Sequence, residues 1–327
     1  MDYNKLIISI GLLFFIGYFY DKYKSSLETD KQFEDFEIVR KYLLGESKEI
    51  SNLRNSSKPI LWIHINYEKN SRDWDSFLSR SSTDLNLPYY YFTLRSIISK
   101  NSNDFNICII DDSTICKLLE QHEFNFDLGN IPEPRKKNVR LLALSKLVYK
   151  YGGLVIPPAF ICFQSLKNLS NITDNNVLLF GENKNESVSF DSYPFIPGYE
   201  IFGSNKENKE LNNFIDYIEN LVNKEYTNEN FFIGNINNYL LNKLRKNDIA
   251  IIKAEHLGLK TNKNKEITIE DLFGNALIEF NDNAYGMLIN NCNILKRHAY
   301  NWFCYLSINE ILDSNFILAK YLINNCQ

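Results

Sequence analysis

Two adjacent aspartates follow the clearest buried strand pattern in the sequence. The segment Asn106 to Leu119 reads NICIIDDSTICKLL, an apolar run that ends at Asp111 and Asp112 and continues as a helix pattern. Open α/β sheets bind their ligands at the carboxyl ends of core strands, so these carboxylates could bind a ligand or act in catalysis. The alternative is that they only help to cap the following helix, whose predicted cap is Ser113 or Thr114.

A second segment, Arg140 to Phe163, combines a helix, a tight reversal and a strand. It reads RLLALSKLVYKYGGLVIPPAFICF, and its apolar spacing predicts a buried helix that ends at Tyr151. Gly152 and Gly153 permit the reversal, because glycine adopts positive φ without a steric cost. An apolar strand is expected from Leu154 to Ile156. The buried face of the helix is predicted to carry Leu141, Leu144, Leu147 and Val148.

This segment resembles the pattern R-x-x-x-L-Y-x-Y-G-G-x-Y-x-D-x-D of the DXD-type sugar-nucleotide glycosyltransferases. That group includes fungal initiating mannosyltransferases and capsular polysaccharide synthesis enzymes. Its two aspartates hold a divalent cation, which neutralises the diphosphate leaving group. Counted from the glycine pair, this chain has Pro157 and Ala159 at those positions, and neither side chain can ligate a metal. The family's upstream Asp and Arg fall on Leu141 and Leu144, so the resemblance implies a retained scaffold with a lost metal site.

The resemblance covers most of residues 58 to 327. Lys58 to Tyr67, KPILWIHINY, looks like the family's first core strand, and Asn106 to Leu119 resembles its second strand with the acidic end. Pro197 to Phe202, with the helix from Leu211 to Val222, resembles a late segment, and Phe280 to Trp302 resembles the C-terminal end. This implies an α/β fold, a GT-A type, Rossmann-like glycosyltransferase domain. Two segments, Ser79 to Ile97 and Tyr151 to Cys162, also resemble a diverged branch encoded by large DNA viruses.

The resemblance also implies where a sugar-nucleotide donor would bind. His64 lies on the first core strand, near the nucleotide position of the family, although a lone histidine is more often structural. Lys136, Lys137 and Arg140 could contact a diphosphate in place of a metal, as basic side chains do in some glycosyltransferases. Their alternative is a solvated basic loop just before the core helix. The other candidate donor-site residues are Asp111, Asp112, Gly152 and Gly153.

Composition limits the classes of partner. The net charge of −4 is spread over interspersed acidic and basic residues, so no nucleic-acid partner is expected. The six cysteines show no close metal-binding spacing, and Cys108 and Cys162 fall inside predicted strands. Reduced, buried thiols are therefore expected, which favours a domain on the cytosolic side of a membrane.

The first residues suggest a membrane segment. Leu6 to Tyr20 contains no charge, which predicts a short uncleaved anchor rather than a cleaved signal peptide. We interpret residues 1–24 as a single-pass anchor, 25–57 as a stalk with a short helix, and 58–327 as the glycosyltransferase-like domain. Amphipathic helices are predicted over Asn208 to Asn223 and Ile308 to Ile323.

Two functions fit this sequence. In the favoured one, the protein is catalytically degenerate and serves as a binding or structural protein of a membrane or virion. In the other, it is an active, metal-independent glycosyltransferase that moves a sugar from a nucleotide donor. No Mn²⁺ cofactor is expected in either case. The expected partners are a membrane, a sugar nucleotide or glycan, and virion or membrane proteins.

Overall fold

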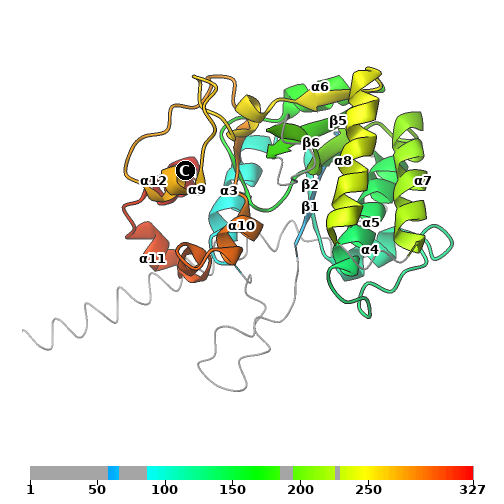
Figure 1. The fold of residues 1–327 in the computed structure, drawn as a ribbon, viewed down its shortest axis with the longest axis horizontal. Coiled ribbons are helices and arrows are strands. Elements are labelled where there is room, and N and C mark those ends of the chain that lie inside the picture. The colour runs from blue at the N-terminus through cyan, green and yellow to red at the C-terminus, as the bar shows by residue number, and fades with distance from the viewer. Residues whose placement is uncertain (1–57, 66–86, 185–193, 225–228, 327) are drawn as a thin grey trace, which may run out of the picture. The chain divides into compact units, whose positions relative to one another are not determined.

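The computed structural model describes residues 58–65, 87–184, 194–224 and 229–326 (Figure 1). All of these belong to one compact unit, Leu43–Gln327. The anchor predicted at Leu6 to Tyr20 and the stalk at residues 25–57 lie outside the described residues. Among the residues that are described, none of the helices has both the length and the apolar character to cross a membrane.

A six-stranded mixed sheet forms the centre of the unit, in the order β2-β1-β3-β6-β5-β7. β1 is parallel to both β2 and β3, β5 is parallel to β7, and β6 is antiparallel to its two neighbours. The carboxyl ends of all strands except β6 therefore share one edge, called here the carboxyl edge. The strands are β1 (Ile60–His64), β2 (Asn106–Ile110), β3 (Gly153–Val155), β5 (Leu178–Lys184), β6 (Phe195–Ser204) and β7 (Ile249–Ile252).

The strand order reverses beside β1, because β2 lies on one side of it and β3 on the other. Open α/β sheets bind ligands in the crevice at such a reversal, at the carboxyl ends of the strands. The chain leaves β2 through α4 (Asp112–Leu118) and returns to β3 through α5 (Arg135–Tyr151). The arrangement is a mixed α/β fold with a parallel-rich, Rossmann-like half, as the sequence predicts.

One face of the sheet is covered by a layer of helices. α5 packs against α7 (Lys209–Asn223), and α8 (Glu229–Arg245) packs against β6 and β7 (Figure 1). The apolar face of α7 is buried in this core together with Phe180, Phe202 and Val148. Asn208 caps α7 by accepting a hydrogen bond from Leu211 N, and the helix runs to Asn223, so this sequence prediction is confirmed.

A second, smaller core surrounds a two-stranded antiparallel sheet of β4 (Phe160–Cys162) and β8 (Gly286–Leu288). α3 (Tyr90–Asn101) packs against β4 and against α12 (Ile317–Asn325). The remaining described elements are α6 (Lys167–Thr173), η3 (Ala254–Leu257), α9 (Ile269–Phe273), α10 (Asn291–Lys296), η4 (Asn301–Tyr305) and α11 (Ile308–Leu312).

The helix predicted from Ile308 to Ile323 is wrong as one element, because α11 and α12 are separate. Ser307 starts α11 with a capping box, and the chain then leaves the helix after Leu312. Ile317 N donates to Gly274 O at 3.0 Å instead of to a carbonyl one helical turn before it. Ser314 N still donates to Ile311 O in α11, and the start of α12 is held at the end of α9 by the bond from Ile317 to Gly274.

The glycine turn at Gly152 and Gly153 joins α5 to β3 as predicted. Both residues have positive φ, 73° and 110°, and Gly152 N donates to Val148 O at 2.7 Å. Trp62 Nε1 on β1 donates to Gly152 O at 2.9 Å. β3 begins at Gly153, one residue before the predicted strand, because Gly153 already pairs with β6. The turn therefore fixes how β3 enters the sheet beside β1.

Candidate functional site

An ionic cluster lies at the carboxyl edge, where β1 and β2 end. Asp112 accepts two hydrogen bonds from Arg140, from Nε to Oδ1 at 2.8 Å and from Nη2 to Oδ2 at 2.7 Å. His64 Nε2 lies 2.9 Å from Asp112 Oδ1, and Lys136 Nζ lies 3.6 Å from Asp112 Oδ2. Both carboxylate oxygens of Asp112 are therefore engaged.

Three elements bring this cluster together. His64 is the last residue of β1 and pairs in register with Ile110, the last residue of β2, so Asp112 begins α4 next to it. α5 starts at the same edge, and its first two turns carry Lys136 and Arg140 toward Asp112. The parallel sheet and the returning helix thus gather four of the candidate donor-site residues.

The two neighbouring aspartates have different partners. Asp111 is the N-cap of α4, since its carboxylate accepts Thr114 N at 2.7 Å and Ser113 Oγ at 3.0 Å. The prediction that Ser113 or Thr114 caps this helix is therefore wrong, because Asp111, two residues before Ser113, supplies the acceptor. The capping interpretation holds for Asp111, whereas Asp112 turns to His64 and Arg140.

The interpretation of Lys136, Lys137 and Arg140 as a basic loop before the core helix is also wrong. All three lie within α5, and Arg140 is only 8% exposed. Cationic side chains are unfavourable near the N-terminal end of a helix, because that end carries partial positive charge. The carboxylate of Glu133, just before α5, compensates for this. This carboxylate accepts Arg140 Nη1 at 2.9 Å and Lys137 N at 3.1 Å.

Charge pairing controls the chemistry of Asp112. Partial burial opposes ionisation, but the hydrogen bonds from His64 and Arg140 outweigh it and hold the pKa of Asp112 well below its usual range. Asp112 is thus a carboxylate at neutral pH with both oxygens paired. Such a group positions cations rather than accepting a proton from a substrate. The carboxylates of Asp112 and Glu133 also offset the charges of Lys136 and Arg140.

The residues at the metal positions of the resembled family do not fit a cation. Pro157 is half-buried and lies just beyond β3 at the carboxyl edge. The residue before it, Ile156, is still bonded to β1, because its N donates to Trp62 O at 3.0 Å. Ala159 is 4% exposed and belongs to the smaller core with Ile161 and Met287. Within the described ranges, no group of three or more His, Cys, Asp or Glu side chains could hold a metal ion.

The other positions singled out by the family resemblance belong to the scaffold. Leu141 is 4% exposed and Leu144 is half-buried, and both contribute to the main core. Gly152 and Gly153 lie at the opposite edge of the sheet from the cluster, since Gly153 approaches Ile60 at the start of β1. They shape the scaffold and do not line the edge where His64 and Asp112 lie.

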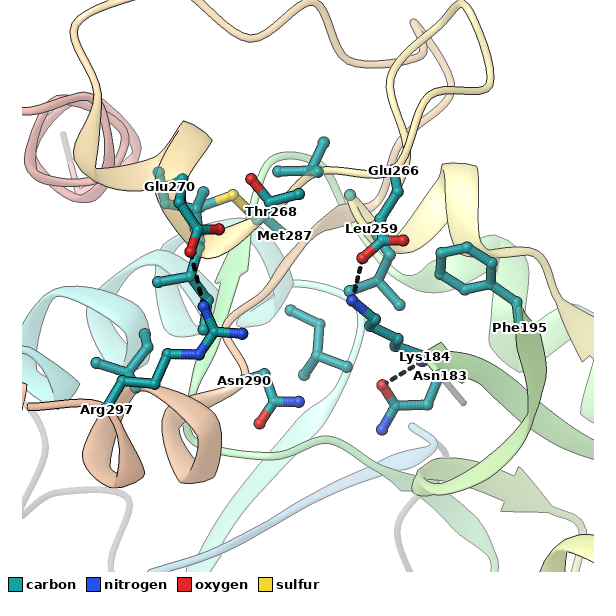
Figure 2. Close-up of a pocket in the computed structure, with 16 residues that line it drawn as sticks. Asn183, Lys184, Phe195, Leu259, Glu266, Thr268, Glu270, Met287, Asn290 and Arg297 are labelled. Atoms are coloured by element: carbon teal, nitrogen blue, oxygen red, sulfur yellow. Dashed lines mark hydrogen bonds and ion pairs between the residues drawn. The ribbon is translucent and has the colours of Figure 1, made fainter. Parts of the chain in front are cut away.

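A pocket of about 290 Å³ opens elsewhere on the carboxyl edge, at β5 and β6 (Figure 2). Its walls come from the end of β5, the start of β6, the segment after η3, α9, the end of β8 and α10. No sequence pattern indicates this pocket, because its segments are far apart along the chain and none carries a recognisable motif. Its polar residues are Asn183, Lys184, Glu266, Thr268, Glu270, Asn290 and Arg297.

No family model matches this chain, and no curated protein matches it. Among solved structures, the apo form of the glycosyltransferase GlyE from Streptococcus pneumoniae TIGR4 is similar at 14% identity with a TM-score of 0.35. The match covers 61% of this chain and 46% of that chain, so it spans about half the length of GlyE. A similarity of this extent does not assign a family or an activity to the chain.

Proposed function

We propose that this protein is a glycosyltransferase-like protein that has lost metal-dependent sugar transfer and acts by binding. Support comes from the resemblance around Gly152 and Gly153 together with the Rossmann-like half of the sheet. The order of strands provides the crevice in which this type of fold binds ligands. Among the described residues, the carboxyl edge has no set of side chains that could hold the divalent cation of the family's reaction.

The observation that carries the proposal is the pairing of Asp112. A carboxylate that ligates a cation, or that takes a proton from an acceptor hydroxyl, needs an oxygen directed at the reactants. Asp112 instead directs both oxygens at Arg140, His64 and Lys136. At neutral pH the cluster therefore serves as an internal ion pair that joins β1, α4 and α5.

The alternative is an active, metal-independent transferase. It is favoured by Lys136 and Arg140, two cationic groups at the carboxyl edge that could offset the charge of a diphosphate. The guanidinium of Arg140, however, already donates through Nε, Nη1 and Nη2 to Asp112 and Glu133. A diphosphate would have to displace these carboxylates, which counts against sugar transfer from a nucleotide donor and leaves a binding role as the better supported function.

Calorimetry tests the loss of metal dependence. UDP-glucose and GDP-mannose are titrated into the full-length chain, once with Mn²⁺ and once with EDTA, and each is also titrated into Mn²⁺ alone as a control. Because Pro157 and Ala159 offer no ligand, we expect the Kd of each nucleotide sugar to change less than about twofold between the two conditions. Binding that is tightened about tenfold or more by Mn²⁺ would contradict the proposal.

A further inference from the structure

We propose that the pocket at β5 and β6 binds an uncharged sugar ring. The site lies at the other end of the carboxyl edge from the cluster of His64 and Asp112, with β3 between them. The inference therefore does not depend on whether the cluster binds a nucleotide. It rests on three properties of the pocket, namely its charge, its mixture of polar and apolar walls, and its size.

The charged side chains of the pocket are paired with one another. Lys184 pairs with Glu266, and Arg297 Nη1 donates to Glu270 Oε1 at 2.7 Å. Figure 2 shows these ion pairs on opposite sides of the pocket, with Asn290 between them. The four charges of the lining sum to zero, so the lining offers an ionic ligand no excess of opposite charge. The ammonium of Lys260 lies outside the lining, over the Phe195 ring, and donates to Asn264 Oδ1 at 3.0 Å. A charged ligand would have to break an ion pair to be compensated.

Paired carboxylates and amides still bind hydroxyl groups well. A carboxylate has several acceptor positions, and one salt-bridge partner leaves room for a hydroxyl donor. Glu266, Glu270, Asn183 and Asn290 thus offer acceptors from several directions. A ligand with hydroxyl groups around its rim can use them without disturbing the ion pairs.

The apolar part of the wall suits a ring with C–H groups on its faces. Phe195 lies at the start of β6, and the ammonium nitrogen Nζ of Lys260 lies over its ring, 4.5 Å from the ring centroid. This cation–π contact holds the ring in place at the pocket wall. Aliphatic side chains complete the lining, namely Leu259, Ile267, Ile269, Leu272, Met287, Leu288 and Ile294. Such a wall excludes water from a ligand that has both apolar and polar surface.

The size of the pocket suits a ligand of about one ring. Its volume of about 290 Å³ lies near the lower end of ligand pockets, roughly 300 to 1,000 Å³. Charge, wall chemistry and size together therefore select a neutral monosaccharide unit.

Ligand-observed NMR on the full-length chain tests the proposal. The neutral probes are D-glucose, D-galactose, D-mannose and N-acetyl-D-glucosamine, and the charged probes are D-glucuronate and D-glucosamine. We expect at least one neutral sugar to bind with a Kd on the order of 1 mM, which is typical of a ligand of this size. Glucuronate and glucosamine should bind at least fivefold more weakly than the best neutral sugar.

Variants locate the binding in this pocket. Phe195→Ala should weaken the neutral sugar about tenfold, while Phe195→Trp keeps an aromatic ring and should retain binding. Phe231→Ala is the matched control, because Phe231 is 62% exposed on α8 and does not line the pocket. Glu270→Gln leaves Arg297 unpaired, so the affinity for glucuronate relative to glucose should rise at least threefold.

Several results would overturn the proposal. One is that no neutral sugar binds at concentrations of about 10 mM, well above the expected Kd. Another is that the charged sugars bind as tightly as the neutral ones to the unaltered chain. A third is that Phe195→Ala and Phe231→Ala weaken binding equally, which would place the sugar elsewhere.

Discussion

Replacing Gly153 by valine is expected to lower the free energy of unfolding by about 4 kcal/mol or more. The φ of 110° at Gly153 is a conformation that L-residues rarely adopt. A Cβ atom there would lie 2.3 Å from the carbonyl oxygen of Ile60, which belongs to the backbone of β1 and cannot move aside. Backbone strain and overpacking therefore add. Urea unfolding of the two proteins, followed by far-UV circular dichroism, measures the difference.

Gly234→Val is the matched control for this change. Gly234 lies within α8, and a Cβ atom added there meets no neighbour within 4 Å. Valine and glycine differ by only a few tenths of a kcal/mol in a helix, so this variant should unfold within about 0.5 kcal/mol of the parent. Equal losses at Gly153 and Gly234 would show that the turn does not have the close approach described here.

Ala159→Asp is expected to destabilise the protein by about 3 kcal/mol or more at pH 7. Ala159 is 4% exposed and is packed among Ile161, Met287 and Ile289. A carboxylate there would be cut off from solvent, and the larger side chain would overpack the core. By contrast, Pro157→Asp should cost less than about 1 kcal/mol, because Pro157 is half-buried at the carboxyl edge and can direct a carboxylate to water. Thermal and urea unfolding at pH 7 measure both changes.

The loss at Ala159→Asp should depend on pH in one direction. Burial would raise the pKa of the new carboxyl above its unfolded value of about 3.9, so the folded state binds more protons. The penalty should therefore be smallest below about pH 4 and grow as the pH rises. Ala159→Val adds volume without charge, and its loss should not change with pH. A mild, pH-independent effect of Ala159→Asp would mean that this position opens to solvent.

Elements whose signals lie within a few neighbouring residues could be predicted from the sequence. The apolar run of β2, the helix that ends at Tyr151 and the positive φ of the glycine pair depend on neighbouring residues. The same holds for α7, whose cap Asn208 and apolar face are both contained in one segment. Such elements can be predicted because side-chain spacing and glycine conformation act over a few residues.

The candidate site could be predicted only in part, because its contacts join distant residues. Asp112 and His64 are recognisable as ends of strands, but no local pattern shows that Arg140 returns through α5 to pair with Asp112. The pocket is a stronger example, since Lys184 and Glu266 meet only after β5 and the segment before α9 are brought together. The break before Ile317 likewise depends on a distant partner, Gly274.

The most direct test of the central claim is the release of nucleoside diphosphate from sugar nucleotides. The full-length chain is incubated with UDP- and GDP-sugars, with and without neutral monosaccharide acceptors, in Mn²⁺ and separately in EDTA. We expect release no faster than in reactions without protein under either condition, because Pro157 and Ala159 hold no cation and Asp112 is paired with Arg140. Release that requires Mn²⁺ would contradict the loss of metal-dependent transfer, and release in EDTA would show an active, metal-independent transferase instead.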